Sequence, residues 1–304
     1  MQASLKRVPW RRAAHVAGAV MAIVAVALLT QRGFSLRASL GDALARIPWS
    51  HFLLAVSWYA AGGLLLGWVW MLLVRTGVGS RVEARPLVAS HLRSQLGKYL
   101  PGNVVHFAWR HLAARAQGAD HRALALALAL ESLLLLGAGA LLALSVVADP
   151  RIAARFPWAA KLAWLAPLLP ALALAAGFAF ARRRGVGRQA APRLALAFAL
   201  CVVFMLLAAL ALRTLAAEPR LLPFTAWCGW LSLAWAVGYV TPGAPGGIGL
   251  REAVLVLGLD PVFGEADALA LAVAYRLVTV VADGVLAVAG FLSWRGAAGA
   301  REKR

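Results

Sequence analysis

Residues 123–147 read ALALALALESLLLLGAGALLALSVV and contain a single charged side chain, Glu131. A run of about 20 predominantly apolar residues is long enough to cross a bilayer as an α-helix. Because hydrocarbon offers no water to satisfy backbone groups, a helix is the form that such a segment takes. Seven runs of this kind predict membrane-spanning helices: Ala13–Thr30, Phe52–Val74, Ala123–Val147, Leu162–Ala181, Leu194–Leu212, Phe224–Val240 and Ala268–Leu292.

The composition of the whole chain agrees with this interpretation. Of 304 residues, 62% are apolar and 14% are charged, against roughly 25% charged in an ordinary soluble domain. The high apolar content excludes disorder, and two cysteines within apolar runs exclude a disulfide scaffold. A nucleic-acid-binding protein would carry more charge, so we expect no nucleic-acid partner. The sequence predicts an all-α, polytopic integral membrane protein.

The excess of basic residues, a net charge of +19, predicts the orientation. Four Lys and Arg residues lie in segment 1–12, eight in 75–122 and five in 182–193, whereas the alternate loops hold three, three and two. Because cytoplasmic loops are enriched in Lys and Arg, we expect a cytoplasmic N-terminus in the cell inner membrane. The organisation is then a basic segment 1–12, one transmembrane domain 13–294 and a basic tail 295–304.

The tail complicates the number of spans. Its four basic residues should also prefer the cytoplasm, but seven crossings would place it outside. An eighth, shorter crossing would resolve the conflict, and Gly246–Leu259 is the candidate. The expected number is seven or eight.

Residues 85–118 read RPLVASHLRSQLGKYLPGNVVHFAWRHLAARAQG, a stretch too apolar for a surface loop and too charged for a span. Its leucines recur at helical spacing until Pro101-Gly102 interrupts the helix, because proline removes a donor and glycine permits a turn. A second amphipathic piece carrying Arg110 follows. Two structures remain open: a hairpin lying on the cytoplasmic interface, or a re-entrant pair that lines a cavity within the membrane.

Residues 239–259 read YVTPGAPGGIGLREAVLVLGL and contain a second break. Two prolines and four glycines fall between Pro242 and Gly249, and Arg251-Glu252 then opens another apolar helix. Amides at such a helix start can bind an anion; a plain turn between two spans is the alternative. Interrupted segments in both halves of a chain are typical of a transport site near the bilayer midplane.

Three charges lie inside predicted spans: Glu131, Arg276 and Asp283. Each costs roughly 2.5–3.5 kcal/mol at mid-bilayer on insertion scales, so each should face protein or water. Arg276 is a candidate partner for Glu131, and Arg251 or Lys98 for Asp283; a structural ion-pair network and a polar pathway for a headgroup both remain open. The candidate lipid-binding or translocation residues are Lys98, Pro101, Gly102, Asn103, Arg110, Glu131, Pro242, Gly243, Pro245, Gly246, Gly247, Gly249, Arg251, Glu252, Arg276 and Asp283.

The two Pro-Gly motifs also resemble those of a known family. Gln95-Leu-Gly-Lys-Tyr-Leu-Pro-Gly-Asn103 and Thr241-Pro-Gly-Ala-Pro-Gly-Gly-Ile-Gly-Leu-Arg-Glu252 are similar to motifs in the transmembrane region of lysylphosphatidylglycerol synthases and its stand-alone relatives. Glu131 within a span and Tyr275-Arg276 in the last span resemble the same family, and the resemblance covers residues from about 13 to 294.

This resemblance implies an inner-membrane protein linked to lipid translocation. In full-length synthases the matching region is flippase-like, and a separate cytosolic domain transfers the amino acid. Because the sequence ends ten residues after Trp294, we expect no such domain and no aminoacyl transfer. Stand-alone relatives are associated with hopanoid and glycolipid pathways, so the resemblance leaves the lipid open.

The expected function is translocation of an anionic or glycosylated membrane lipid between leaflets. Lys98, Arg110, Arg251 and Arg276 would attract an anionic headgroup, and Glu131, Glu252 and Asp283 would order these cations or handle coupled protons. The first alternative is a non-transporting scaffold whose basic face recruits a lipid-modifying enzyme. The second is a membrane-embedded enzyme, which we do not favour because no nucleophile–base or metal motif is visible; we expect no cofactor.

Overall fold

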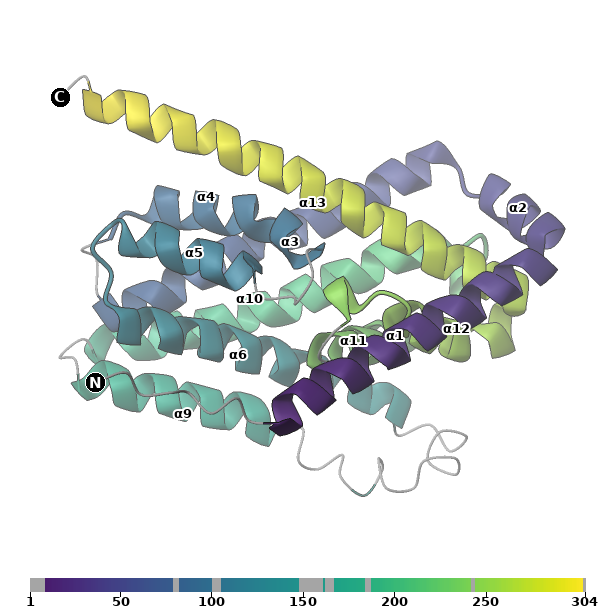
Figure 1. Ribbon diagram of the computed structural model, residues 1–304, viewed down its shortest axis with the longest axis horizontal. Helices are drawn as coiled ribbons and strands as arrows, with labels where there is room; N and C mark the ends of the chain where they lie inside the picture. The colour runs from purple at the N-terminus through teal and green to yellow at the C-terminus, as the bar shows by residue number, and fades with distance from the viewer. Residues whose placement is uncertain are drawn as a thin grey trace.

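The computed structural model describes residues 9–78, 82–99, 105–147, 161, 167–183, 187–241 and 244–302, and the regular structure within them is entirely helical (Figure 1). The α-helices there are α1 (Pro9–Ser35), α2 (Arg37–Ala45), α3 (Trp49–Val78), α4 (Ala84–Ser94), α5 (Val105–Arg115), α6 (His121–Val147), α9 (Leu168–Arg183), α10 (Gly187–Thr214), α11 (Phe224–Val240), α12 (Leu250–Phe263) and α13 (Glu265–Glu302). Short 3-10 turns are η2 (Gln95–Tyr99), η4 (Pro219–Leu221) and η5 (Pro245–Gly247).

Every apolar run identified in the sequence forms helix where it is described, apart from Pro167, a turn residue directly before α9. Residues 162–166 of the fourth run lie outside the described residues, as do residues 1–8 of the basic N-terminal segment. Among the described helices, four are long and apolar enough to span a membrane: Trp49–Gly77, His121–Val146, Ala190–Thr214 and Glu265–Ser293. The chain is therefore an all-α membrane protein.

One end of the bundle, which we call the basic end, gathers the ends of α3 and α9 with the starts of α6 and α10. Arg193 donates a hydrogen bond of 2.8 Å to the Arg75 carbonyl, which joins α10 to α3. Gly77 lies against Ala123 and Phe180, which adds α6 and α9. The described edges of the basic stretches 75–122 and 182–193 therefore lie at the same end of the bundle.

The opposite end gathers different helix termini. Arg32 pairs with Glu265 at 3.2 Å, so the end of α1 meets the start of α13. The Ser145 hydroxyl donates to the Thr225 carbonyl at 2.9 Å, so the end of α6 meets the start of α11. From here α13 runs the length of the molecule, and its far end lies with the basic end (Figure 1).

Helices α11 and α12 are the antiparallel arms of one hairpin. Trp227 near the start of α11 contacts Phe263 at the end of α12, with ring centroids 5.6 Å apart. Closer to the turn η5, Gly238 lies against the side chain of Arg251. Helix α11 therefore starts, and α12 finishes, at the opposite end. The sequence predicted a crossing at 224–240 and offered 246–259 as a shorter eighth one, and the structure places these two segments antiparallel in one hairpin.

Helices α4 and α5 form the other hairpin, which comes first along the chain and enters from the basic end; α4–α5 is called the first hairpin below and α11–α12 the second. It lies between α3, which finishes at that end, and α6, which starts there, and α4 packs on both α3 and α13. Its turn η2 contacts the turn η5 in the interior. Figure 1 shows the two hairpins approaching the centre from opposite ends.

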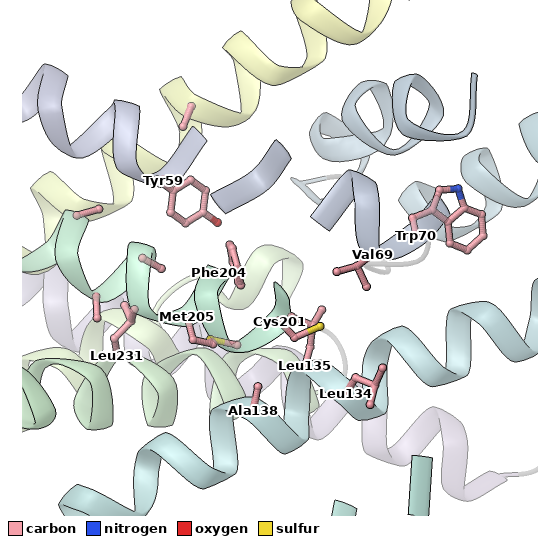
Figure 2. Packing of buried hydrophobic residues seen from close by; sticks show 14 of the residues in the cluster. Tyr59, Val69, Trp70, Leu134, Leu135, Ala138, Cys201, Phe204, Met205 and Leu231 are labelled. Atoms are coloured by element: carbon pink, nitrogen blue, oxygen red, sulfur yellow. The ribbon is translucent and has the colours of Figure 1, made fainter. Parts of the chain in front are cut away.

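The core of the bundle is built on the close contact of α3 with α10. Gly62 of α3 allows Phe204 of α10 to approach, and the rings of Tyr59 and Phe204 meet edge to face with centroids 6.0 Å apart (Figure 2). The outward surface is rich in exposed leucine, valine and isoleucine, while Arg110, Glu131 and Asp283 are buried. An apolar outer surface around a core that is itself mostly apolar, with a few buried charges, fits a bundle surrounded by lipid.

Candidate functional site

A polar cavity lies where the tips of the two hairpins meet. It has about 90 Å³ of space for water-sized molecules, which is room for several waters. Both hairpins and the spanning helices α3, α6, α10 and α13 contribute to its wall. The polar and aromatic lining residues include Tyr59, His91, Lys98, His106, Arg110, Glu131, Trp235, Tyr239, Arg251 and Asp283.

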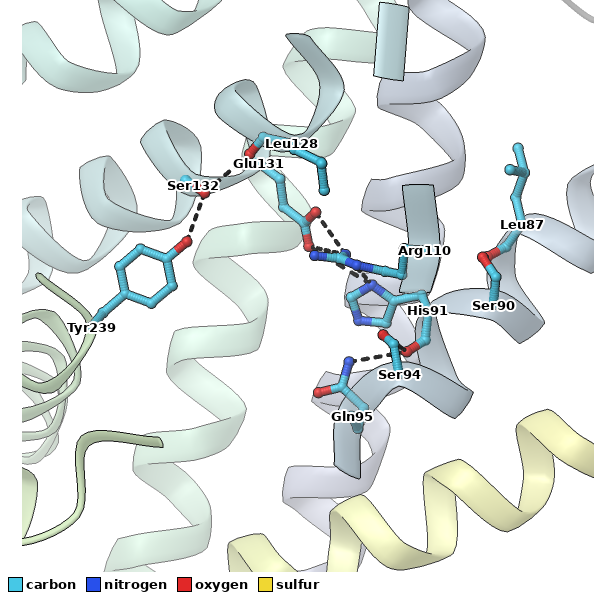
Figure 3. Close-up of polar contacts among 10 residues, drawn as sticks. All are labelled: Leu87, Ser90, His91, Ser94, Gln95, Arg110, Leu128, Glu131, Ser132 and Tyr239. Atoms are coloured by element: carbon cyan, nitrogen blue, oxygen red, sulfur yellow. Dashed lines mark hydrogen bonds and ion pairs between the residues drawn. The ribbon is translucent and has the colours of Figure 1, made fainter. Parts of the chain in front are cut away.

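The first charged cluster joins the α4–α5 hairpin to α6. Arg110 of α5 donates to both carboxylate oxygens of Glu131, at 2.8 and 2.7 Å (Figure 3). The same nitrogen lies 2.7 Å from Nδ1 of His91 on α4. Because a guanidinium can only donate, His91 Nδ1 must accept, so the imidazole is neutral. The cluster is a buried ion pair supported by a neutral histidine.

The α11–α12 hairpin is attached to the same helix one residue further along. The Tyr239 hydroxyl lies 2.6 Å from the Ser132 hydroxyl, to which it donates, and Ser132 in turn donates to the Leu128 carbonyl at 3.0 Å (Figure 3). Tyr239 also stacks on Trp235, with centroids 4.7 Å apart. Consecutive residues of α6, Glu131 and Ser132, therefore hold the two hairpins on either side of the cavity.

The second charged cluster joins the turn η2 to α13. Lys98 Nζ lies 2.7 Å from a carboxylate oxygen of Asp283, and the Tyr99 hydroxyl donates to the same oxygen. The Asp283 side chain is 1% exposed and that of Lys98 is 20% exposed. This pair was among the alternatives expected from the sequence, and it fixes the tip of the first hairpin against the middle of α13.

The third cluster lies at the turn of the second hairpin. Gly249 donates its backbone N–H to Glu252 at 2.7 Å, so this carboxylate caps its own helix α12. Arg276 of α13 donates to the Gly246 carbonyl at 2.9 Å and lies 3.8 Å from Glu252. Gly246 has a φ of +57°, a conformation that favours glycine. The Arg276 side chain thus binds the turn mainly through the backbone of the turn.

The sequence-derived site residues come together only in part. Lys98, Arg110, Glu131, Gly246, Arg251 and Asp283 line the polar cavity, and Arg251, Glu252 and Arg276 line a smaller neighbouring cavity of about 20 Å³. Gly247 and Gly249 lie in the adjoining turn with positive φ, and Pro245 begins η5. The proposed Pro101, Gly102, Asn103, Pro242 and Gly243 lie outside the described residues.

One expected pairing is wrong. Glu131 pairs with Arg110 rather than with Arg276, because the α4–α5 hairpin inserts beside α6 and reaches Glu131 first. Sequence reasoning also missed His91, Tyr99 and Tyr239. Their only signal was position: His91 and Tyr99 lie in the stretch around the first Pro-Gly break, and Tyr239 directly precedes the second.

No protein-family model matches the sequence, and no curated protein matches it. Among the residues that the structure describes, no group of three or more His, Cys, Asp or Glu side chains is placed to hold a metal ion. A fold alone does not define a function, so the chemistry of the charged clusters is the guide. Three buried carboxylates, each beside a cation and close to a small wet cavity, form a site suited to a charged or strongly polar group.

Proposed function

We propose that this chain binds the headgroup of a membrane lipid in the polar cavity and moves the lipid between leaflets. The observation that carries the proposal is the position of the cavity: it lies between the tips of two hairpins that enter from opposite ends. Intramembrane charges mark substrate pathways, and interrupted helices in both halves of a chain mark transport sites. The resemblance to the flippase-like region of lysylphosphatidylglycerol synthases supports the same function.

The proposed topology is six crossings and two re-entrant hairpins. The crossings are α1, α3, α6, α9, α10 and α13, and the re-entrant hairpins are α4–α5 and α11–α12. With an even number of crossings, the end of α13 lies on the same side as the basic loops. The basic tail 295–304 then lies on the side that its charge favours. With the basic end in the cytoplasm of the cell inner membrane, one hairpin faces each leaflet.

The geometry supports a closed conformation of such a transporter. The cavity has room for several waters but is far smaller than a typical ligand pocket of roughly 300–1,000 Å³. Lys98–Asp283 and Arg110–Glu131 tie the first hairpin to two spanning helices. Alternating access would require one hairpin to move while the other stays in place. We therefore expect these ion pairs to rearrange when a headgroup enters.

The test is lipid movement in reconstituted vesicles. Phosphatidylcholine vesicles carry a trace of phosphatidylglycerol labelled with a fluorophore on its acyl chain, and dithionite quenches only the outer leaflet. Wild-type protein should accelerate loss of the protected fluorescence, and Arg276→Ala should abolish the acceleration while inserting normally. Lack of acceleration with phosphatidylglycerol, a glycolipid and an aminoacylated lipid probe alike would contradict the proposal.

The exposed basic side chains Arg182 and Arg183 favour the scaffold alternative, since they present charge at the basic end, away from the cavity. The double variant Arg182→Gln/Arg183→Gln separates the two functions. If the chain is a transporter, lipid movement should survive this change. If it is a scaffold, recruitment of a lipid-modifying enzyme to vesicles should be lost. The scaffold alternative predicts a different pair of results: the wild type would move no lipid, and Arg276→Ala would still recruit the enzyme to vesicles.

A further inference from the structure

The charges around the two cavities do not balance. Four cations and three carboxylates from the described residues line them: Lys98, Arg110, Arg251 and Arg276 against Glu131, Glu252 and Asp283. His91 is neutral because its Nδ1 accepts from Arg110. One positive charge is therefore in excess, before any protonation of the second imidazole, His106.

Arg251 is the cation left over. Each carboxylate has a nearer cation, and among the described residues no carboxylate lies within ion-pair distance of the Arg251 guanidinium. Its Nε is buried and has no hydrogen-bond partner. The residue as a whole is partly exposed, and it lines both cavities. Charges drawn away from bulk water are normally paired, because desolvation without a counter-ion is costly. Among the described residues that line the two cavities, one cation is therefore left without a carboxylate partner.

The surroundings of Arg251 hold it in place without neutralising it. Its guanidinium lies 5.7 Å from the centre of the Trp235 ring. A Cβ added at Gly238 or at Gly247 would come within 2.5 or 2.6 Å of Arg251 side-chain atoms, so both glycines are needed for its close fit. Aromatic packing and two glycines thus create a preorganised cation between α11 and η5.

An apolar groove of about 320 Å³ leads toward this cation from the outer surface. Val26 and Thr30 of α1 form one wall of the groove, and Leu277 of α13 forms part of the other. Glu252 and Arg276 line this groove and also the smaller cavity that Arg251 lines. At 3.8 Å this pair is longer than a hydrogen bond, so it is a weak partition between groove and cavity.

We infer that Arg251 binds one phosphodiester monoanion, the phosphate of an anionic phospholipid whose acyl chain occupies the groove between α1 and α13. One negative charge balances the excess, and a guanidinium matches phosphate oxygens with paired donors. The apolar groove supplies the environment that an acyl chain requires. This inference rests on the proposed lipid-handling function and names the chemical class that the site accepts.

Equilibrium binding to purified protein in neutral detergent tests the inference. Dioctanoyl phosphatidylglycerol should bind once per chain by native mass spectrometry and raise the thermal midpoint. Dioctanoylglycerol, which lacks the phosphate, should do neither. Glycerophosphoglycerol, which lacks the chains, should bind at least tenfold more weakly; equal affinity for this water-soluble headgroup would contradict the acyl-chain part and indicate a site for free phosphodiesters.

Arg251→Gln removes the excess charge. We expect at least about tenfold weaker binding of phosphatidylglycerol, in line with the loss of charged hydrogen bonds, and an unchanged or higher thermal midpoint without lipid. Arg251→Lys should retain part of the affinity. Arg220→Gln, at an exposed arginine of η4, is the matched control and should bind as wild type does. Unchanged affinity in Arg251→Gln, or a sharp loss of its lipid-free stability, would overturn the inference.

Thr30→Trp fills the groove and should weaken binding of phosphatidylglycerol without affecting glycerophosphoglycerol. Ile23→Trp, on an exposed part of the same helix outside the groove, is its control. The binding assay is independent of transport. Intact binding without translocation would contradict only the proposed function, whereas translocation with unchanged binding in Arg251→Gln would contradict only this inference.

Discussion

The two hairpins meet at one cavity but are held by different forces. The α4–α5 hairpin contributes two cations, Lys98 and Arg110, each paired with a carboxylate on a spanning helix. The α11–α12 hairpin instead uses its own carboxylate, Glu252, to cap its turn, and its arms pack through glycines. The difference teaches that the α4–α5 hairpin is anchored by ion pairs, whereas the α11–α12 hairpin is anchored by close backbone contact. The second hairpin also carries Arg251, which has no carboxylate partner among the described residues.

Removing the carboxylate that anchors the first hairpin should have the largest effect. Glu131→Ala leaves Arg110 buried without a counter-ion, and breaking such a pair costs about 3–5 kcal/mol. The loss of stability is measured as the change in unfolding free energy in mixed detergent–SDS titrations. Glu218→Ala, at an exposed carboxylate, should change stability by about 0.5 kcal/mol or less. A small loss in Glu131→Ala would show that the ion pair does not anchor the hairpin.

Crowding the arms of the second hairpin should have the next largest effect. A Cβ at Gly258 would come within 2.2 Å of the Trp230 ring, so Gly258→Ala should cost about 1–3 kcal/mol through overpacking. Gly284 in α13 has no described atom within 4 Å of an added Cβ. Gly284→Ala should therefore be neutral or stabilising by up to about 1 kcal/mol. Similar losses at both positions would argue against anchoring by close backbone contact.

The carboxylates of the two hairpins can be compared directly by removing charge and keeping shape. Glu252→Gln retains an oxygen that accepts from Gly249, so its stability loss should be about 1 kcal/mol or less. Glu131→Gln removes the counter-charge of a buried arginine and should cost more. Unfolding of the two variants under identical conditions gives the ranking. If Glu252→Gln proved the more damaging, the charge of Glu252 would be anchoring the second hairpin.

Acid should loosen the first hairpin slightly and leave the second unaffected. His111 of α5 and His121 of α6 lie with Nε2 and Nδ1 2.7 Å apart. Burial, followed by the proximity of His121, lowers the pKa of His111 below its ordinary value of about 6.5. The folded state favours the neutral form of His111. The stability that this neutral histidine contributes is therefore fully present above about pH 6.5 and is lost as the pH falls.

Hydrogen exchange, corrected for the intrinsic effect of pH, should therefore show lower protection of α5 amides at pH 5 than at pH 7. The α11 amides should show no such change. His111→Gln should remove the difference in α5. An equal loss of protection in both hairpins would mean that the histidine pair is not the cause.

Much of the cavity was predictable from the sequence because charges inside apolar runs are rare and must face protein or water. Glu131, Arg276 and Asp283 were identified in this way, and Lys98 was named as a partner for Asp283. The Arg110–Glu131 pair was not predicted, because it depends on where a hairpin inserts between spanning helices. His91 and Tyr239 carry no distinctive pattern and become visible only through their contacts.

The sequence by itself determined that the chain is an all-α membrane protein and which charges lie within it. Apolar run length is a local property, and a bilayer requires each such run to satisfy its own backbone. Only the tertiary structure decided that residues 224–240 and 246–259 are arms of one hairpin, and that Arg251, alone among the described cations lining the two cavities, has no carboxylate within ion-pair distance. Ion pairing depends on distances between residues far apart in the chain, and hydropathy along the sequence does not contain those distances.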